Sequence, residues 1–126
     1  MSLPGKIYLF MILIWFASGS SDSKSLLVEP KVKLVTEQDK NDMGEIVTEF
    51  QLINKGEEPI TILSVSPHCS CTDYTISSLK VNSDKSETLS LSVPWDQLKT
   101  LGEVYAVIKT DSKQKFLKVS VRAQEK

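Results

Sequence analysis

The sequence predicts an all-β protein, an antiparallel β-sandwich of about seven strands, and three observations lead to this prediction. Apolar residues recur with a period of two over short segments, as in strands that bury one face. Turn-forming residues separate these segments at spacings of roughly ten residues. No segment of helical period is long enough to connect two parallel strands. A chain of 126 residues, 40% of them hydrophobic, suffices for one domain with a modest core.

Residues 1–19 have the pattern of a secretory signal peptide. Lys6 precedes an unbroken apolar run at 7–16, and Ala17 and Gly19 are small residues at the two positions that signal peptidase reads. The alternative is an uncleaved membrane anchor, but ten apolar residues at about 1.5 Å each fall short of the ~30 Å hydrocarbon core. We therefore expect cleavage after Gly19 and secretion across the inner membrane to the periplasm or cell envelope, with membrane association only if the segment is retained.

The structural elements follow a polar leader at 20–29, which we expect to stay flexible, and the domain is expected to span 30–124. The predicted strands are 32–35, 46–54, 60–62, 74–81, 88–93, 104–108 and 117–121. Asn54 and Gly56 favour a turn, so a hairpin is expected between the second and third of these strands. A turn at 110–113 joins the last two strands.

Residues 95–101 are predicted to form a single helical turn between strands. Asp96 is a suitable N-cap for it, and Gly102 can end it in the left-handed conformation. Burying one face of each strand predicts a two-layer core. Its expected members are Phe50, Leu52, Ile60, Ile62, Leu89, Leu91, Ile108, Val119 and Val121.

Cys69 and Cys71 are the only cysteines, and their spacing excludes the long-range bridge that joins the two sheets of antibody-type sandwiches. On an extended strand the two side chains share a face, with the Cα atoms about 6.6 Å apart, at the long edge of the disulfide range. A bridge between them therefore needs a bend, which Pro67 makes plausible. A structural bridge and a dithiol redox pair both remain open, although no Lys/Arg cluster or helix N-terminus flanks the pair to activate a thiolate.

A metal site is the weaker interpretation of the same segment. His68, Cys69, Cys71 and Met43 together could offer soft ligands for Cu(I). Strand alternation, however, turns His68 away from the cysteine face, and an exposed turn histidine is the simpler interpretation. Zinc with three adjacent protein ligands is less favoured still. We therefore expect no metal and no cofactor.

Other functional classes find little support. Without residues 1–19 the chain has 14 basic and 16 acidic side chains, because that segment holds one lysine and no acid, so nucleic acid is not an expected partner. No Gly-x-Ser-x-Gly elbow or phosphate-binding loop is present, and no catalytic residue is expected. Trp95 beside Pro94 could mark a binding surface, but a tryptophan that plugs the core is the favoured interpretation.

Three segments carry a resemblance to a known family: 50–56, 59–62 and 69–72. They resemble the bacterial family of secreted immunoglobulin-like domains called domain of unknown function (number fifteen seventy-three), which is similar to Hydin-like and major-sperm-protein-like modules. The family pattern has an apolar strand ending in Asn-x-Gly, a second strand, Ser-Cys-Gly-Cys-Thr and a later Pro-Gly turn, and the match covers roughly 30–122. Ser70 replaces the central glycine, which makes a tight kink harder, and Asn82-Ser83-Asp84 stands at the Pro-Gly turn. The resemblance implies an envelope-located, immunoglobulin-like sandwich without an established activity.

These observations favour a secreted, non-catalytic interaction module whose partner is another envelope or cell-surface protein, contacted by strand addition or by loops. The main alternative is a small thiol-disulfide or Cu(I)-handling protein that uses Cys69 and Cys71. A third option is a structural envelope protein that self-associates through an exposed edge strand. Intact mass with and without a thiol reagent would distinguish a bridge, free thiols and bound metal.

Overall fold

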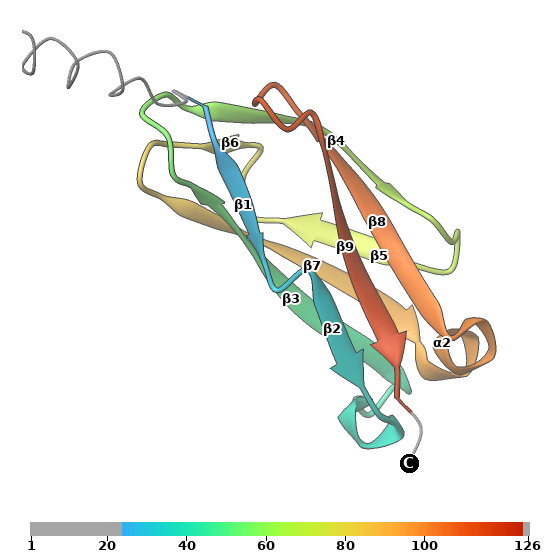
Figure 1. Cartoon of the computed structure of the whole chain (residues 1–126). Helices are drawn as coiled ribbons and strands as arrows, with labels where there is room; N and C mark the ends of the chain where they lie inside the picture. The colour runs from blue at the N-terminus through green and yellow to red at the C-terminus, as the bar shows by residue number, and fades with distance from the viewer. Residues whose placement is uncertain (1–23, 125–126) are drawn as a thin grey trace, which may run out of the picture.

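The computed structural model describes residues 24–124, which form two β-sheets stacked face to face (Figure 1). The four-stranded sheet has the order β1 (Leu26–Glu29), β3 (Glu45–Asn54), β7 (Ser86–Pro94), β5 (Asp73–Ile76). The five-stranded sheet has the order β2 (Val32–Val35), β9 (Phe116–Ala123), β8 (Glu103–Thr110), β4 (Ile60–Pro67), β6 (Lys80–Val81). Two short helical elements are η1 (Glu37–Asp39) and α2 (Trp95–Leu101). The predicted all-β sandwich is confirmed.

Two details of the predicted sandwich differ in the structure. The described residues form nine strands rather than about seven, and one pairing is parallel: β2 runs in the same direction as β9. The other pairings are antiparallel. Among the described residues, no helix combines the length and the apolar character needed to cross a membrane. The predicted signal peptide at 1–19 lies outside the described residues.

The prediction of a flexible leader is wrong for residues 26–29. They form β1, which pairs with the C-terminal half of β3. Leu26 and Val28 are buried in the core, and this burial of apolar surface favours an ordered segment. The leader residues 20–23 lie outside the described part of the chain.

The hairpin predicted after β3 is also wrong, because β3 and β4 belong to different sheets. Both edges of β3 are already paired, one with β1 and the other with β7. At the end of β3 the side chain of Asn54 is fully buried, and its amide donates to the carbonyl oxygens of Glu58 (2.8 Å) and Val81 (2.9 Å). Its Oδ1 accepts from the backbone N–H of Gly56 at 2.8 Å. Asn54 therefore holds the chain as it crosses from one sheet to the other.

The segment predicted as one strand at 74–81 is two strands in different sheets. β5 pairs with β7, whereas β6 pairs with β4. Between them the backbone N–H of Ser77 donates to Thr88, on the four-stranded side, and Leu79 accepts from Ile62, on the five-stranded side. The apolar pattern of this segment is irregular because its inward direction changes where the chain changes sheet.

The helical segment forms as predicted, but Asp96 does not cap it. α2 begins directly after Pro94, which occupies the N-cap position and makes no side-chain capping bond. Gly102 ends the helix with φ of 84°, and its N–H donates to the carbonyl oxygen of Leu98 at 2.7 Å. The left-handed conformation that glycine favours is thus used at the predicted position.

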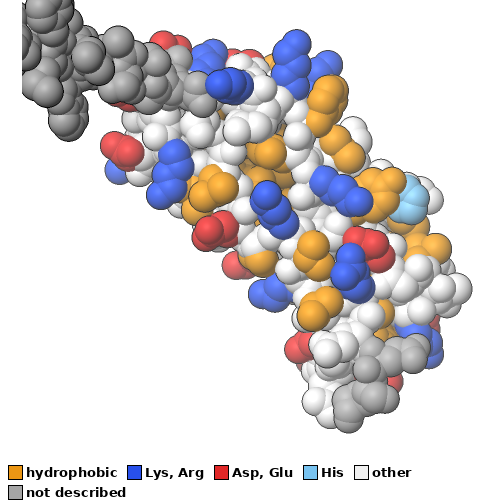
Figure 2. All heavy atoms as spheres, in the orientation of Figure 1, with side chains coloured by type: hydrophobic (Ala, Val, Ile, Leu, Met, Phe, Trp, Pro, Cys, Tyr) orange, Lys and Arg blue, Asp and Glu red, His pale blue; other side chains and the backbone are white. Residues whose placement is uncertain are grey.

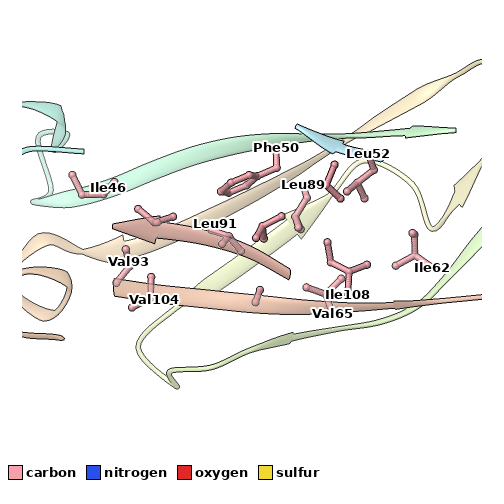
Figure 3. Packing of buried hydrophobic residues seen from close by; sticks show 14 of the residues in the cluster. Ile46, Phe50, Leu52, Ile62, Val65, Leu89, Leu91, Val93, Val104 and Ile108 are labelled. Carbon is pink, nitrogen blue, oxygen red and sulfur yellow. The ribbon is translucent and has the colours of Figure 1, made fainter. Parts of the chain in front are cut away.

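The core lies between the two sheets, with side chains of β3 and β7 directed toward those of β4 and β8 (Figure 3). All nine residues predicted for it are at most 2% exposed. In β3 the buried positions alternate from Ile46 to Asn54, so the period of two does reflect one buried face. The turn at 110–113 joins β8 and β9 as predicted.

We expect Leu91→Ala to lower the free energy of unfolding by roughly 2 to 5 kcal/mol, because it removes a fully buried side chain and leaves a cavity. Glu58→Ala is the control, since the Glu58 side chain is exposed and only its backbone bonds to Asn54; its effect should stay within about 0.5 kcal/mol. Denaturant unfolding measures both. Equal effects of the two substitutions would contradict the assigned core.

Asp111, in the β8–β9 turn, should make stability depend on acid pH. Its carboxylate accepts from the backbone N–H of Thr61 at 2.9 Å, and this bond, together with the Lys24 ammonium at 3.3 Å, lowers the pKa of Asp111. A lowered pKa stabilises the fold above the unfolded-state pKa of about 3.9, and this contribution is lost as the pH falls through the folded-state value.

Asp111→Asn should therefore destabilise the protein at pH 7, and the difference from wild type should shrink at strongly acid pH. Unfolding midpoints at both pH values measure this difference. Asp42→Asn, in an exposed turn, is the control. A difference between wild type and the Asp111→Asn variant that is the same at both pH values would disprove the role assigned to the charge.

Candidate interaction surface beside the disulfide turn

Cys69 and Cys71 are joined by a disulfide in the turn between β4 and β5. Their Cα atoms are 5.1 Å apart, shorter than on an extended strand. The bend comes from a β-turn in which the N–H of Thr72 donates to the carbonyl oxygen of Cys69 at 3.0 Å. The prediction that a bridge needs a bend is therefore confirmed. Cys69 and Cys71 lie in a β-turn and not on an extended strand.

The turn does not require the glycine that the family has at position 70. Among the described residues other than glycine, Asp84 alone has a positive φ, of 62°. Ser70 therefore lies in a conformation that a residue with a Cβ adopts without strain. Asp84, by contrast, occupies the left-handed region at the place of the family's Pro-Gly turn.

Both cysteines are half-buried and pack against the core, while Ser70 between them is exposed. The N–H of Cys71 donates to the Sγ of Cys69 at 3.1 Å. The bridge lies where the chain leaves the five-stranded sheet for the four-stranded sheet, so it fixes a crossing between the layers.

His68 lies on the outer face of the five-stranded sheet, away from the disulfide. Its backbone N–H donates to the carbonyl oxygen of Tyr105 at 2.8 Å, and its ring stacks on the Tyr105 ring with centroids 4.4 Å apart. The ammonium of Lys118 lies 4.5 Å from the centre of the same Tyr105 ring, a cation–π contact. The three side chains form one cluster that joins β8, β9 and the start of the disulfide turn.

The four Cu(I) candidates are not arranged as a ligand set in this structure. The sulfurs of Cys69 and Cys71 are bonded to each other, and His68 stacks on Tyr105. Met43 is 82% exposed in the turn before β3. Within residues 24–124, no three His, Cys, Asp or Glu side chains gather in a way that could hold a metal ion.

Trp95 is 6% exposed at the start of α2, and its indole Nε1 has no hydrogen-bond partner. Trp95 forms part of the wall of a hollow of about 350 Å³, together with Lys99 and Gln124. The Nε1 atom itself is covered, so a molecule in the hollow would not reach the N–H group. This position is that of a core plug with one edge at the surface.

The outer face of the five-stranded sheet combines exposed apolar and cationic side chains. We call it the basic face. Because Val104, Ala106 and Ile108 point inward, the alternate residues of β8 and their β9 and β2 neighbours point outward. The exposed members are Val32, Leu34, Leu63, Lys109, Phe116, Lys118 and Arg122, arranged around half-buried Tyr105 and Val107. Figure 2 shows hydrophobic and basic side chains interleaved across the visible side of the molecule, with several acidic side chains among them.

Sequence reasoning missed this face. Leu63 alternates with buried Ile62 and so projects outward, at the point where a bulge shifts the register of β4 between Ile62 and Ser64. The polar and apolar residues of β8 and β9 that alternate with the core could have pointed to it. The sequence predicted contact by strand addition or by loops, whereas Phe116, which is 63% exposed, lies on a sheet face.

Comparison with solved structures supports the fold. A protein of unknown function from Porphyromonas gingivalis W83 matches with a TM-score of 0.67 and 12% identity; the match covers 85% of this chain but only 50% of that one. WR4, an MSP family member of C. elegans, matches with a TM-score of 0.53 and 11% identity over 82% of this chain and 100% of its own. SSP-19, an MSP-domain protein like family member of Caenorhabditis elegans, matches with a TM-score of 0.55 and 13% identity. This match covers 78% of the present chain and 98% of SSP-19.

No curated protein matches this chain. At identities of 11 to 13%, the structural matches show a shared immunoglobulin-like and MSP-like sandwich. A family model, in contrast, matches residues 31–124, which include the Asn54 crossing, the disulfide turn and every strand of the two sheets except β1. The chain belongs to the family described as "Protein of unknown function (DUF1573)".

Proposed function

We propose that this protein is a secreted, non-catalytic interaction module of the cell envelope that docks another envelope or cell-surface protein on its basic face. One observation carries the proposal: Val32, Leu34, Leu63 and Phe116, which are 41 to 63% exposed, share one sheet face. Large apolar side chains gathered on one exposed face are a mark of interaction surfaces. The location rests on the predicted signal at residues 1–19.

The composition of the basic face also suits a protein partner. Tyr105 lies near its centre, next to His68 and Lys118, and Arg122 lies at one end, 3.6 Å from the carboxylate of Glu103. Aromatic residues and arginine are enriched in protein interfaces, whereas a face that only meets water needs neither. The sandwich core beneath holds these side chains on a rigid sheet.

The disulfide turn supports this surface from one side. The cysteine bridge fixes the chain immediately after His68, whose ring lies on Tyr105. A restrained turn reduces the loss of conformational entropy when a partner docks on the neighbouring side chains. In this proposal the bridge therefore has a structural role.

A photo-reactive amino acid placed at Phe116 or Leu34 should cross-link to an envelope or cell-surface protein in producing cells. Both side chains are more than half exposed, so the exchange should change the free energy of unfolding by less than about 0.5 kcal/mol. The same amino acid at Met43, which is 82% exposed and lies off the basic face, is the control. Equal cross-linking at Met43 and Phe116, or none at Phe116 and Leu34, would contradict the proposal.

A second candidate function is thiol-disulfide exchange, which one contact favours. The N–H of Cys71 points at the Sγ of Cys69, and such a donor would stabilise a thiolate there when the bridge is reduced. The reduced pair would then pass two electrons and two protons to a partner disulfide, which becomes a dithiol as the Cys69–Cys71 bridge reforms.

The Cys69→Ser/Cys71→Ser double mutant separates the two functions. We expect it to fold, to lose less than the 2 to 5 kcal/mol typical of a native disulfide because the closed ring is so short, and to keep the cross-links from Phe116. Wild-type protein incubated with reduced glutathione should keep its bridge, so its intact mass should not rise after alkylation. Rapid alkylation of both cysteines under these conditions would instead support the exchange function.

A further inference from the structure

Charged residues in the strands are separated by sheet. Within the described chain, the four-stranded sheet carries no basic strand residue and five acidic ones: Glu29, Glu45, Glu49, Asp73 and Glu87. The five-stranded sheet carries one acidic strand residue, Glu103, and five basic ones: Lys33, Lys80, Lys109, Lys118 and Arg122. Outside the strands the described residues hold eight acidic and eight basic side chains. The separation is therefore a property of the two sheets.

Strand alternation places most of the acidic strand residues on the outer face of the four-stranded sheet. We call this the acidic face. Because Ile46, Phe50 and Leu52 point into the core, the alternate positions of β3 point outward. The outward charged residues are Glu29, Glu45, Glu49 and Asp73, with exposed Leu27 and Val47 among them. A shallow depression of about 260 Å³ lies beside Val47, lined by Asp73, Tyr74 and the β7 serines.

We propose that the basic face docks on the acidic face of a second copy of this chain. This inference rests on the proposed function, because it names the partner of the same surface. The two faces complement each other in charge, and each carries exposed apolar side chains that a stack would remove from water. Every copy of this chain carries both faces, so a complementary partner is present wherever the protein is.

The geometry determines what kind of assembly results. The two surfaces are different, so the contact is heterologous. A docked pair uses the basic face of one copy and the acidic face of the other, and therefore leaves one basic and one acidic face open. Association should therefore continue beyond a dimer. Four strands about 4.8 Å apart and nine residues at about 3.3 Å each give a face of roughly 19 by 30 Å, on the order of 570 Å² per partner. An interface of this size belongs to the weak and transient class.

Self-association should therefore be detectable only at high protein concentration, and it should weaken as the salt concentration rises. The protein as cells produce it should show an average mass at least about 1.5 times that of the monomer at roughly 0.1 to 1 mM. Raising the salt from roughly 10 mM to roughly 1 M shortens the Debye length from about 30 Å to about 3 Å and should return the mass to that of the monomer. Sedimentation velocity measures this change.

Charge reversal gives the decisive test. In Glu29→Lys/Glu49→Lys the acidic face loses its net negative charge, because two lysines then offset Glu45 and Asp73, and in Lys109→Glu/Lys118→Glu both faces are acidic, so each variant alone should stay monomeric. A mixture of the two should associate again, because each variant keeps one native face for the other. All four exchanged side chains are exposed, so the folded state should tolerate them. Lys55→Glu/Lys85→Glu and Glu57→Lys/Glu58→Lys are controls that change the net charge equally in the turns and should associate like wild type.

Wild-type protein that stays monomeric at these concentrations in low salt would overturn the inference. So would a charge-reversed variant that associates alone as wild type does, or a mixture that remains monomeric. If Phe116 then still cross-links to a different envelope protein, the proposed function stands and only the identity of the partner is wrong. If anionic lipid vesicles bind the wild type while no self-association occurs, the basic face recognises lipid instead.

Discussion

The buried side chain of Asn54 is the constraint on which the rest of the structure depends. Its amide and carbonyl groups hold Gly56, Glu58 and Val81, while its backbone pairs with the turn at Asp84 and Lys85. These bonds turn the chain out of the four-stranded sheet, through the loop at 55–59, and into the five-stranded sheet. A buried polar group that is fully bonded specifies one arrangement, because any other path would leave it unpaired. The two layers, and therefore their two unlike faces, follow from this crossing.

Much of the fold could be predicted from the alternation of apolar residues alone. That alternation identified all nine expected core residues because it reflects burial of one face, a local property of each strand. Which strands pair is not local. Asn54 and Gly56 look the same in a hairpin turn as in a crossing, and the irregular pattern at 74–81 hides a change of sheet. β1 could not be predicted from alternation, because it has only four residues and apolar Leu27 occupies an outward position between buried Leu26 and Val28.

The need for a bend at Cys69 and Cys71 could be predicted from the sequence, but the side chains that surround the turn could not. Two cysteines one residue apart can meet only if the chain bends, and the β-turn at 69–72 provides the bend. The position of His68 on Tyr105 and the contact of Lys118 with that ring required the register of β8 and β9. The interaction surface is therefore a product of strand pairing, and its residues come from separate segments that single-strand patterns cannot join.

The central claim is that Asn54 directs the crossing between the sheets, and Asn54→Asp tests it most directly. Aspartate has nearly the same shape but cannot donate to the carbonyl oxygens of Glu58 and Val81, and each buried acceptor left unpaired costs about 1 to 3 kcal/mol. The free energy of unfolding should therefore fall by about 2 to 6 kcal/mol in denaturant titrations. Asn82→Asp, an exposed turn residue, should change it by less than about 0.5 kcal/mol. An Asn54→Asp protein as stable as the Asn82→Asp protein would contradict the account.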